Sequence, residues 1–173
     1  MNVTKTAASQ HSKTYEMTVT ALMTAVTCIL APLSIPIGPV PISFTNLAIY
    51  LSLYLLGWKK GTISYLIYLL LGLVGLPVFS GFTGGPSKLA GPTGGYIIGF
   101  VFTALVMWLI ERLLGTKTWV LALSMLLGLA VCYAFGTAWF LVAYARAAGP
   151  IGLWAALGMC VFPFVVPDLV KLA

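Results

Sequence analysis

Two charged residues, Asp168 and Lys171, stand in an apolar stretch near the end of the chain. At the centre of a membrane-spanning helix, each costs about 2.5–3.5 kcal/mol on insertion scales. They are three positions apart, so a helix places them on one face. One interpretation is a mutually neutralised pair near the membrane surface. The other is a polar patch that lines an internal cavity and binds a polar ligand, which we predict because ionisable residues inside membranes usually have a function.

A glycine-rich segment over residues 77–94, PVFSGFTGGPSKLAGPTG, is the second candidate for ligand contact. Closely spaced glycines let a backbone fold tightly and approach a bound molecule. A flexible exterior linker is the simpler interpretation, but Phe79, Phe82 and the nearby Tyr96 are unlike the residues of a solvated linker. We therefore predict that this segment packs over a cavity as a cap.

Thr45 and Asn46 follow a run of prolines and open an apolar segment. An asparagine at a helix start most often caps the helix by accepting a hydrogen bond from a backbone N–H. It could equally bind a ligand near the outer surface, because its amide both donates and accepts. The sequence leaves the two roles open.

Two pairs of small residues lie four positions apart: Gly95 with Gly99, and Ala21 with Ala25. In lipid, such pairs let two helix backbones approach closely. Each pattern is weak in a chain with this many small residues, and internal packing is the simplest role for both.

The sequence lacks the motifs of several enzyme classes. A phosphate-binding P-loop ends in Gly-Lys-Ser or Gly-Lys-Thr, and the chain contains no Gly-Lys pair. It also lacks the G-x-S-x-G and H-E-x-x-H patterns, and its single histidine, His11, lies in the polar N-terminal segment. Cys28, Cys132 and Cys160 lack metal-ligand spacing and are interpreted as packing residues. We predict neither an enzyme nor a metal site.

The composition predicts that lipid surrounds most of the surface. Hydrophobic residues make up 61% of the 173 residues and charged residues 7%, whereas a soluble domain carries about 25% charged residues. Five stretches without a charged residue are longer than the roughly 20 residues that cross a membrane as a helix. The formal net charge of +6 is interpreted as a topology signal and not as a nucleic-acid site.

The apolar segments predict an all-α membrane protein, a bundle of six transmembrane helices over residues 15–173. A polar cytoplasmic tail over residues 1–14 precedes it, and the segment 77–94 is an extracellular loop. Prolines at four positions between 32 and 41 exclude a regular helix after the first span. The first five spans cover approximately residues 17–33, 44–58, 61–76, 95–110 and 118–144.

The last span has two possible starts. If it begins at Pro163, its helix rises only about 16 Å, half a bilayer. Either the span starts near Ile151 and bends at its prolines, or the chain stops before its natural end. We favour the second explanation, because the ending DLVKLA has no polar cap or basic tail.

The cations predict the orientation of the bundle, because Lys and Arg accumulate in cytoplasmic loops. With the N-terminus in the cytoplasm, the external cations are Lys88 and Arg146. The cations that are then internal are Lys5, Lys13, Lys59, Lys60, Arg112 and Lys117.

Three runs resemble the BioY family, the biotin-specific S components of energy-coupling-factor (ECF) vitamin transporters. They are GPVPISFTNLAIYL at 38–51, LGLVGLPVFSGFTGGPSKLAGPTGGYIIGF at 71–100 and PFVVPDLVK at 163–171. The resemblance covers about residues 15–171. The ordered Gly, Pro and Tyr residues of the middle run are its most specific part.

This resemblance implies a six-helix bundle in a prokaryotic cytoplasmic membrane, with both termini in the cytoplasm and biotin in a cavity that opens to the exterior. It also implies a transmembrane coupling subunit and two ABC-type ATPases as partners, because this chain has no nucleotide site. Ala21 and Ala25 match the face that S components turn toward the coupling subunit. The residues that match the family's ligand-binding motifs are Asp168, Lys171, Thr45, Asn46, Thr83, Gly84 and Tyr96. Many relatives carry Asn where Thr83 stands.

Biotin chemistry suits these residues. Asp168 could accept a hydrogen bond from a ureido N–H, and Lys171 could either meet the biotin carboxylate or hold Asp168 in place. Two alternative functions remain: an S component of the same fold for another small vitamin, and a self-sufficient membrane channel or scaffold. A channel should show a continuous polar stripe, and the threonines between residues 18 and 27 are the main polar group inside a span.

Overall fold

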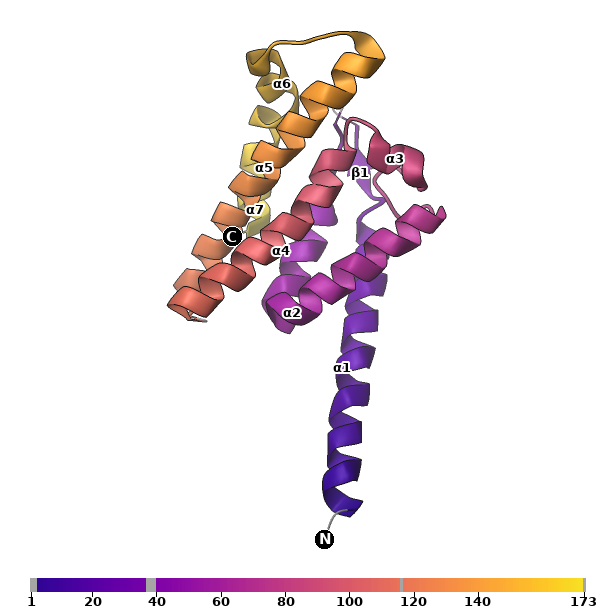
Figure 1. The fold of residues 1–173 in the computed structure, drawn as a ribbon, viewed down its shortest axis with the longest axis vertical. Helices are drawn as coiled ribbons and strands as arrows, with labels where there is room; N and C mark the ends of the chain where they lie inside the picture. The colour runs from indigo at the N-terminus through magenta and orange to yellow at the C-terminus, as the bar shows by residue number, and fades with distance from the viewer. Residues whose placement is uncertain (1–2, 37–39, 116, 173) are drawn as a thin grey trace.

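The computed structural model describes residues 3–36, 40–115 and 117–172, and of residues 3–12, 171 and 172 the backbone alone. These residues form an elongated helical bundle (Figure 1). The first helix, α1 (Val3–Leu30), is 28 residues long and extends beyond the rest of the bundle at one end. Residues 3–14, predicted as a separate tail, are therefore helical and continuous with the apolar part of α1.

The proline-rich segment after α1 is not helical in the residues that the structure describes. Two short strands, β1 (Ser34–Ile35) and β2 (Ile42–Ser43), pair antiparallel, with Ser34 opposite Ser43. Proline cannot donate a backbone hydrogen bond, so a pair of short strands suits this sequence better than a helix. The ribbon brings Ser43 to the start of the next helix.

Helix α2 (Thr45–Val74) consists of two arms that reverse direction at Gly57 (Figure 1). Gly57 has φ 73° and ψ 166°, a backbone conformation that side chains rarely permit. The two arms agree with the predicted spans 44–58 and 61–76. The helix ends at Gly75, which adopts the left-handed conformation with φ 109°.

The glycine-rich segment after α2 is folded onto the bundle. Phe79 is fully buried, pairs with Thr83 through an isolated β-bridge, and packs edge-on against Tyr68 with ring centroids 5.6 Å apart. Gly72 is required at this contact, because a Cβ there would lie 2.1 Å from the Phe79 ring. A short helix, α3 (Pro86–Ala90), completes the segment. Phe79 therefore anchors the loop, whereas Phe82 is exposed.

Helices α4 (Gly94–Leu114) and α5 (Thr118–Ala148) pack closely along their lengths. A Cβ on Gly95 would lie 2.2 Å from the Trp139 side chain, and one on Gly99 would lie 3.0 Å from the Cys132 sulfur. Internal packing is thus confirmed for the glycine pair. It is wrong for Ala21 and Ala25, which lie exposed on the outer face of α1.

The last apolar stretch forms two helices, α6 (Leu153–Cys160) and α7 (Phe162–Leu172). Val161 between them has φ −121° and ψ −58°, immediately before Phe162 and Pro163. Residues 153–170 together make an apolar stretch of 18 residues. This arrangement matches the alternative in which the last span starts near Ile151 and bends at its prolines.

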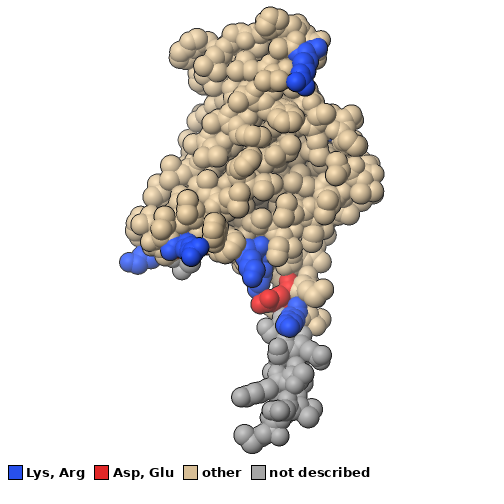
Figure 2. Space-filling model, viewed as in Figure 1, with Lys and Arg blue, Asp and Glu red and all other residues tan. Residues whose placement is uncertain are grey.

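Within the part of the chain that the structure describes, three helical stretches are long and apolar enough to cross a membrane: α4, α5 and residues 153–170. Large apolar side chains are exposed all over the bundle, including Leu70, Leu109 and Val142. Lys and Arg side chains gather at the end where α2 bends and α4 connects to α5, and basic side chains are sparse at the opposite end in this view (Figure 2). These features indicate a multi-pass membrane protein.

The buried residues that the structure describes pack into two clusters. The larger lies among α2, α4 and α5 and is rich in aromatic residues, including Tyr50, Tyr68 and Phe100. The smaller includes Phe140 of α5, Cys160 of α6 and Phe164 of α7. Residues of both clusters meet at one cavity.

Candidate functional site

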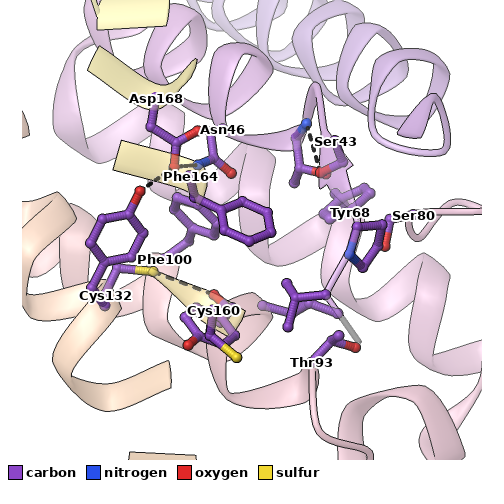
Figure 3. Close-up of a pocket in the computed structure, with 16 residues that line it drawn as sticks. Ser43, Asn46, Tyr68, Ser80, Thr93, Phe100, Cys132, Cys160, Phe164 and Asp168 are labelled. Atoms are coloured by element: carbon purple, nitrogen blue, oxygen red, sulfur yellow. Dashed lines mark hydrogen bonds between the residues drawn. The ribbon is translucent and has the colours of Figure 1, made fainter. Parts of the chain in front are cut away.

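A cavity of about 70 Å³ lies between the two buried clusters (Figure 3). Tyr68, Phe100 and Cys132 of the larger cluster line it, and Phe164 of the smaller cluster faces them. This volume holds a few water molecules but is well below the roughly 300 Å³ at which pockets for drug-sized ligands begin. The complete lining is Val40, Pro41, Ser43, Thr45, Asn46, Tyr68, Ser80, Thr93, Tyr96, Ile97, Phe100, Cys132, Tyr133, Cys160, Phe164 and Asp168.

The polar centre of the cavity is the Asp168 carboxyl group, whose residue is only 1% exposed. Asn46 Nδ2 donates to Asp168 Oδ2 at 2.8 Å, and the Tyr133 hydroxyl donates to the same oxygen at 2.6 Å (Figure 3). A buried charge is tolerated only where donors replace water, and these two bonds do so. Three helices, α2, α5 and α7, therefore meet at one carboxylate oxygen.

Asn46 is not a helix cap. The cap position of α2 is Phe44, and its side chain makes no capping bond. Asn46 is the second residue of α2 and lines the cavity, and its amide is directed at Asp168 (Figure 3). Of the two roles that the sequence left open, the capping role is wrong.

Thr45 supports the junction between the ribbon and α2. Its hydroxyl accepts from the Ser43 hydroxyl at 2.8 Å and donates toward the Ala31 carbonyl at 3.5 Å. These bonds tie the end of α1, the second strand and the start of α2 together. Thr45 and Ser43 thereby fix the wall from which Asn46 projects.

Tyr96, at the start of α4, forms the opposite side of the cavity. Its hydroxyl shares a hydrogen bond with Thr137 Oγ1 at 3.1 Å, and the Cys132 thiol contacts its carbonyl oxygen at 3.6 Å. Gly136 makes room for the ring, because a Cβ there would lie 2.2 Å from it. The position of Tyr96 therefore depends on the missing side chain at Gly136 of α5.

A family model places this sequence among known proteins: the model of the BioY family matches residues 3–173. The chain belongs to the BioY family. The resemblance seen in the three sequence runs is thereby confirmed.

Relatives of this BioY family chain are named as transporters. It is 39% identical over 161 residues to a probable biotin transporter BioY of Pyrococcus horikoshii, covering 93% of this chain and 91% of the relative. It is 40% identical over 151 residues to the biotin transporter BioY of Thermotoga maritima, covering 87% and 85%. These relatives confirm the prediction that the chain is not an enzyme.

A solved structure shares the fold of this BioY family chain. The crystal structure of the S-component for biotin from an ECF-type ABC transporter superposes with a TM-score of 0.81 at 34% sequence identity. The match covers 94% of this chain and 87% of the solved one. The helical bundle described above is thus an S-component fold.

Four of the residues predicted from family motifs line the cavity: Asp168, Asn46, Thr45 and Tyr96. Thr83 and Gly84 do not line it. Thr83 instead donates to the Ser80 carbonyl at 3.0 Å, and Ser80 does line the cavity.

Gly84 shapes the same loop, because a Cβ there would lie 2.3 Å from the Leu76 carbonyl oxygen. Thr83 and Gly84 therefore affect the cavity indirectly, because they fix the fold of the loop above it. The side chain of Lys171 lies outside the described residues.

Sequence reasoning missed Tyr133, the second donor to Asp168. It stands in the middle of α5 among apolar residues, where a tyrosine resembles any aromatic packing residue. Cys132 and Cys160 were interpreted as packing residues, and both are buried, but they also line the cavity. The sequence did contain one sign that this part of α5 packs closely against the cavity wall. It is the small residue Gly136, which lies one turn after Cys132 and faces Tyr96.

Proposed function

We propose that this chain is the biotin-binding membrane subunit of an ECF-type uptake transporter. It would capture biotin from the exterior and deliver it with an ATP-driven coupling module. The observation that carries the proposal is the buried Asp168 carboxylate at the wall of a largely apolar cavity, in a chain of the BioY family. A small ligand with N–H donors and an apolar ring system matches that combination.

Biotin presents two ureido N–H donors, one carbonyl acceptor, a sulfur-containing ring and a carboxylate tail. Asp168 would accept from a ureido N–H, while Phe100 and Phe164 enclose the rings. Thr45, Asn46 and Tyr96 would complete the wall, with Thr83 and Gly84 shaping the loop above. Lys171 would meet the carboxylate tail or orient Asp168.

The proposed topology has six spans with both termini in the cytoplasm of a prokaryotic cell. The bend of α2 at Gly57 supplies two of these spans, and α6 with α7 supplies the last. The gathering of Lys and Arg at the end that contains this bend supports placing that end in the cytoplasm (Figure 2). Residues 77–94 then face the exterior.

The partners would be a transmembrane coupling subunit and two ABC-type ATPase subunits. The solved neighbour is described as a component of an ECF-type ABC transporter, and this sequence contains no P-loop of its own. Ala21 and Ala25 lie exposed on α1, as a helix-packing face for a membrane partner requires.

The threonines of α1 do not support a self-sufficient channel. Thr20, Thr24 and Thr27 are buried, and each hydroxyl donates to the carbonyl four residues earlier at 2.8–2.9 Å. A conducting pore needs polar groups that face the ion or water. All three hydroxyls are thus bonded within the protein, and Thr24 also shares a hydrogen bond of 3.0 Å with the Ser64 hydroxyl of α2.

Calorimetric titration of the purified chain with biotin, thiamine and riboflavin tests the proposal. Biotin should bind and the other two vitamins should not. Binding of another vitamin in preference to biotin would favour the alternative S component. Uptake assays in vesicles, with and without a coupling module, then test the transport role: brisk ATP-driven uptake without any partner would contradict it.

A further inference from the structure

Tyr50 carries a hydroxyl that the observed hydrogen bonds do not explain. The residue is 3% exposed, and its hydroxyl has no hydrogen-bond partner within the described part of the chain. Buried hydroxyls in native proteins are almost always paired, because an unpaired one loses its bond to water without replacement. A hydroxyl retained at such a cost near a cavity indicates a partner that arrives with a ligand.

Tyr50 lies directly behind the cavity wall. It is four residues after Asn46 on α2, so the two side chains share one face of the helix. Its ring packs edge-on against Phe100, which lines the cavity, with centroids 6.4 Å apart. Because Asn46 bonds to Asp168, this face of α2 is the one turned toward the carboxylate.

Three hydroxyl donors of the cavity wall are already committed. Tyr133 donates its single proton to Asp168, Ser43 donates to Thr45, and Thr45 donates toward a backbone carbonyl. Because the cavity of about 70 Å³ is smaller than typical ligand pockets, its wall must yield when a ligand binds. Movement of Phe100 would bring the Tyr50 hydroxyl into contact with the ligand.

We propose that Tyr50 is a further ligand-binding residue, whose hydroxyl donates a hydrogen bond to the ureido carbonyl oxygen of biotin. This inference rests on the proposed function. In a cyclic urea the carbonyl oxygen lies beside both N–H groups, so a donor next to Asp168 can reach the oxygen while Asp168 accepts from an N–H. Asp168 and Tyr50 would thus read both kinds of polar group on the ureido ring, and the ring would enter the cavity first.

The substitution Tyr50→Phe tests this role, because it removes the hydroxyl and keeps the ring. Calorimetry should compare biotin with 2-iminobiotin, in which an imino group replaces the ureido carbonyl oxygen. Tyr50→Phe should weaken biotin binding about tenfold, the effect of one hydrogen bond, and change 2-iminobiotin binding much less. An equal loss for both ligands, or no loss for biotin, would overturn the inference.

Thermal unfolding without ligand separates this role from a structural one. Tyr50→Phe should raise the unfolding temperature, because it removes an unpaired buried hydroxyl. The matched control is Tyr65→Phe: the Tyr65 hydroxyl donates to the Ile97 carbonyl, so its loss should lower the unfolding temperature. A lowered unfolding temperature for Tyr50→Phe would indicate a structural bond and contradict the inference. If the unaltered chain fails to bind biotin at all, the proposed function itself is wrong.

Discussion

Asn46 and Asp168 are 122 residues apart in the sequence and share a hydrogen bond of 2.8 Å between Nδ2 and Oδ2. The bond joins the start of α2 to the last turns of α7, across the cavity. Because the Tyr133 hydroxyl donates to the same oxygen, the carboxylate is both a candidate ligand acceptor and a link between helices. Substitutions can separate these two roles.

Asp168→Asn should weaken biotin binding more than it weakens folding. The asparagine keeps the size of the side chain and one acceptor oxygen, but it loses the charge that strengthens a hydrogen bond from the ligand. Hydrogen bonds to charged groups contribute about 1.5–3 kcal/mol, so we expect roughly a 10- to 100-fold loss of affinity by calorimetry. Unchanged affinity would show that Asp168 does not contact the ligand.

Asn46→Ala and Tyr133→Phe should show coupled effects on stability. Each variant removes one donor to Asp168 Oδ2, at a cost of about 1–3 kcal/mol. Neighbours that share a partner are not independent, so the double variant should differ from the sum of the two by about 0.5–3 kcal/mol. Detergent-based unfolding of all four forms measures this coupling. Strict additivity would mean that the two bonds do not act on one network.

Gly136→Ala should destabilise the fold and displace Tyr96. The added methyl group would lie 2.2 Å from the Tyr96 ring, and overpacking of this kind costs about 1–3 kcal/mol. Gly158→Ala in α6 is the matched control, because no atom lies within 4 Å of its added methyl group. We expect the control to be neutral or slightly stabilising, since alanine favours helix. Equal unfolding temperatures for the two variants would contradict the packing argument.

Lys88 should make the free energy of unfolding depend on pH. Burial lowers the pKa of Lys88, on α3 outside the spans, below its usual 10.5. Between that lowered value and 10.5 the unfolded chain binds more protons than the folded chain, so the contribution of Lys88 to stability rises with pH in this window. Below this pH range Lys88 is charged in both states, and the cost of burying its charge lowers the stability of the folded chain.

Unfolding temperatures from neutral pH to about pH 10 measure this contribution. Lys88→Met has no charge to bury, and Lys88→Arg stays charged throughout. Relative to both variants, the unaltered chain should show an additional rise of the unfolding temperature with pH. Identical slopes for the three chains would exclude a contribution from Lys88.

The sequence predicted most of the helices because lipid imposes a simple rule: charge-free runs become helices, and prolines or paired cations end them. The pair Lys59 and Lys60 predicted the end of a span close to the point where α2 reverses direction, although the break itself falls at Gly57. The break at Val161 was harder to place, because prolines can either end a helix or bend it. Only the packing of α6 and α7 beside α5 distinguishes these outcomes.

The candidate site was predictable where polar residues interrupt apolar sequence, as at Asp168 and Asn46. Tyr133 and Tyr50 were not predictable, because a tyrosine is amphipathic and its hydroxyl matters only once its neighbours are known. Thr83 and Gly84 marked the correct loop, but the β-bridge between Phe79 and Thr83 turns them toward the loop and away from the cavity. Such tertiary pairings leave no periodic trace in a sequence.

Among the described residues that line the cavity, none comes from α1. The helix nevertheless holds the junction beneath Asn46, because the Ala31 carbonyl at its end accepts from Thr45. Its outer face, with Ala21 and Ala25, is exposed. Mutations on that face can therefore accumulate without altering which molecule the interior accepts, and the two surfaces are free to evolve at different rates.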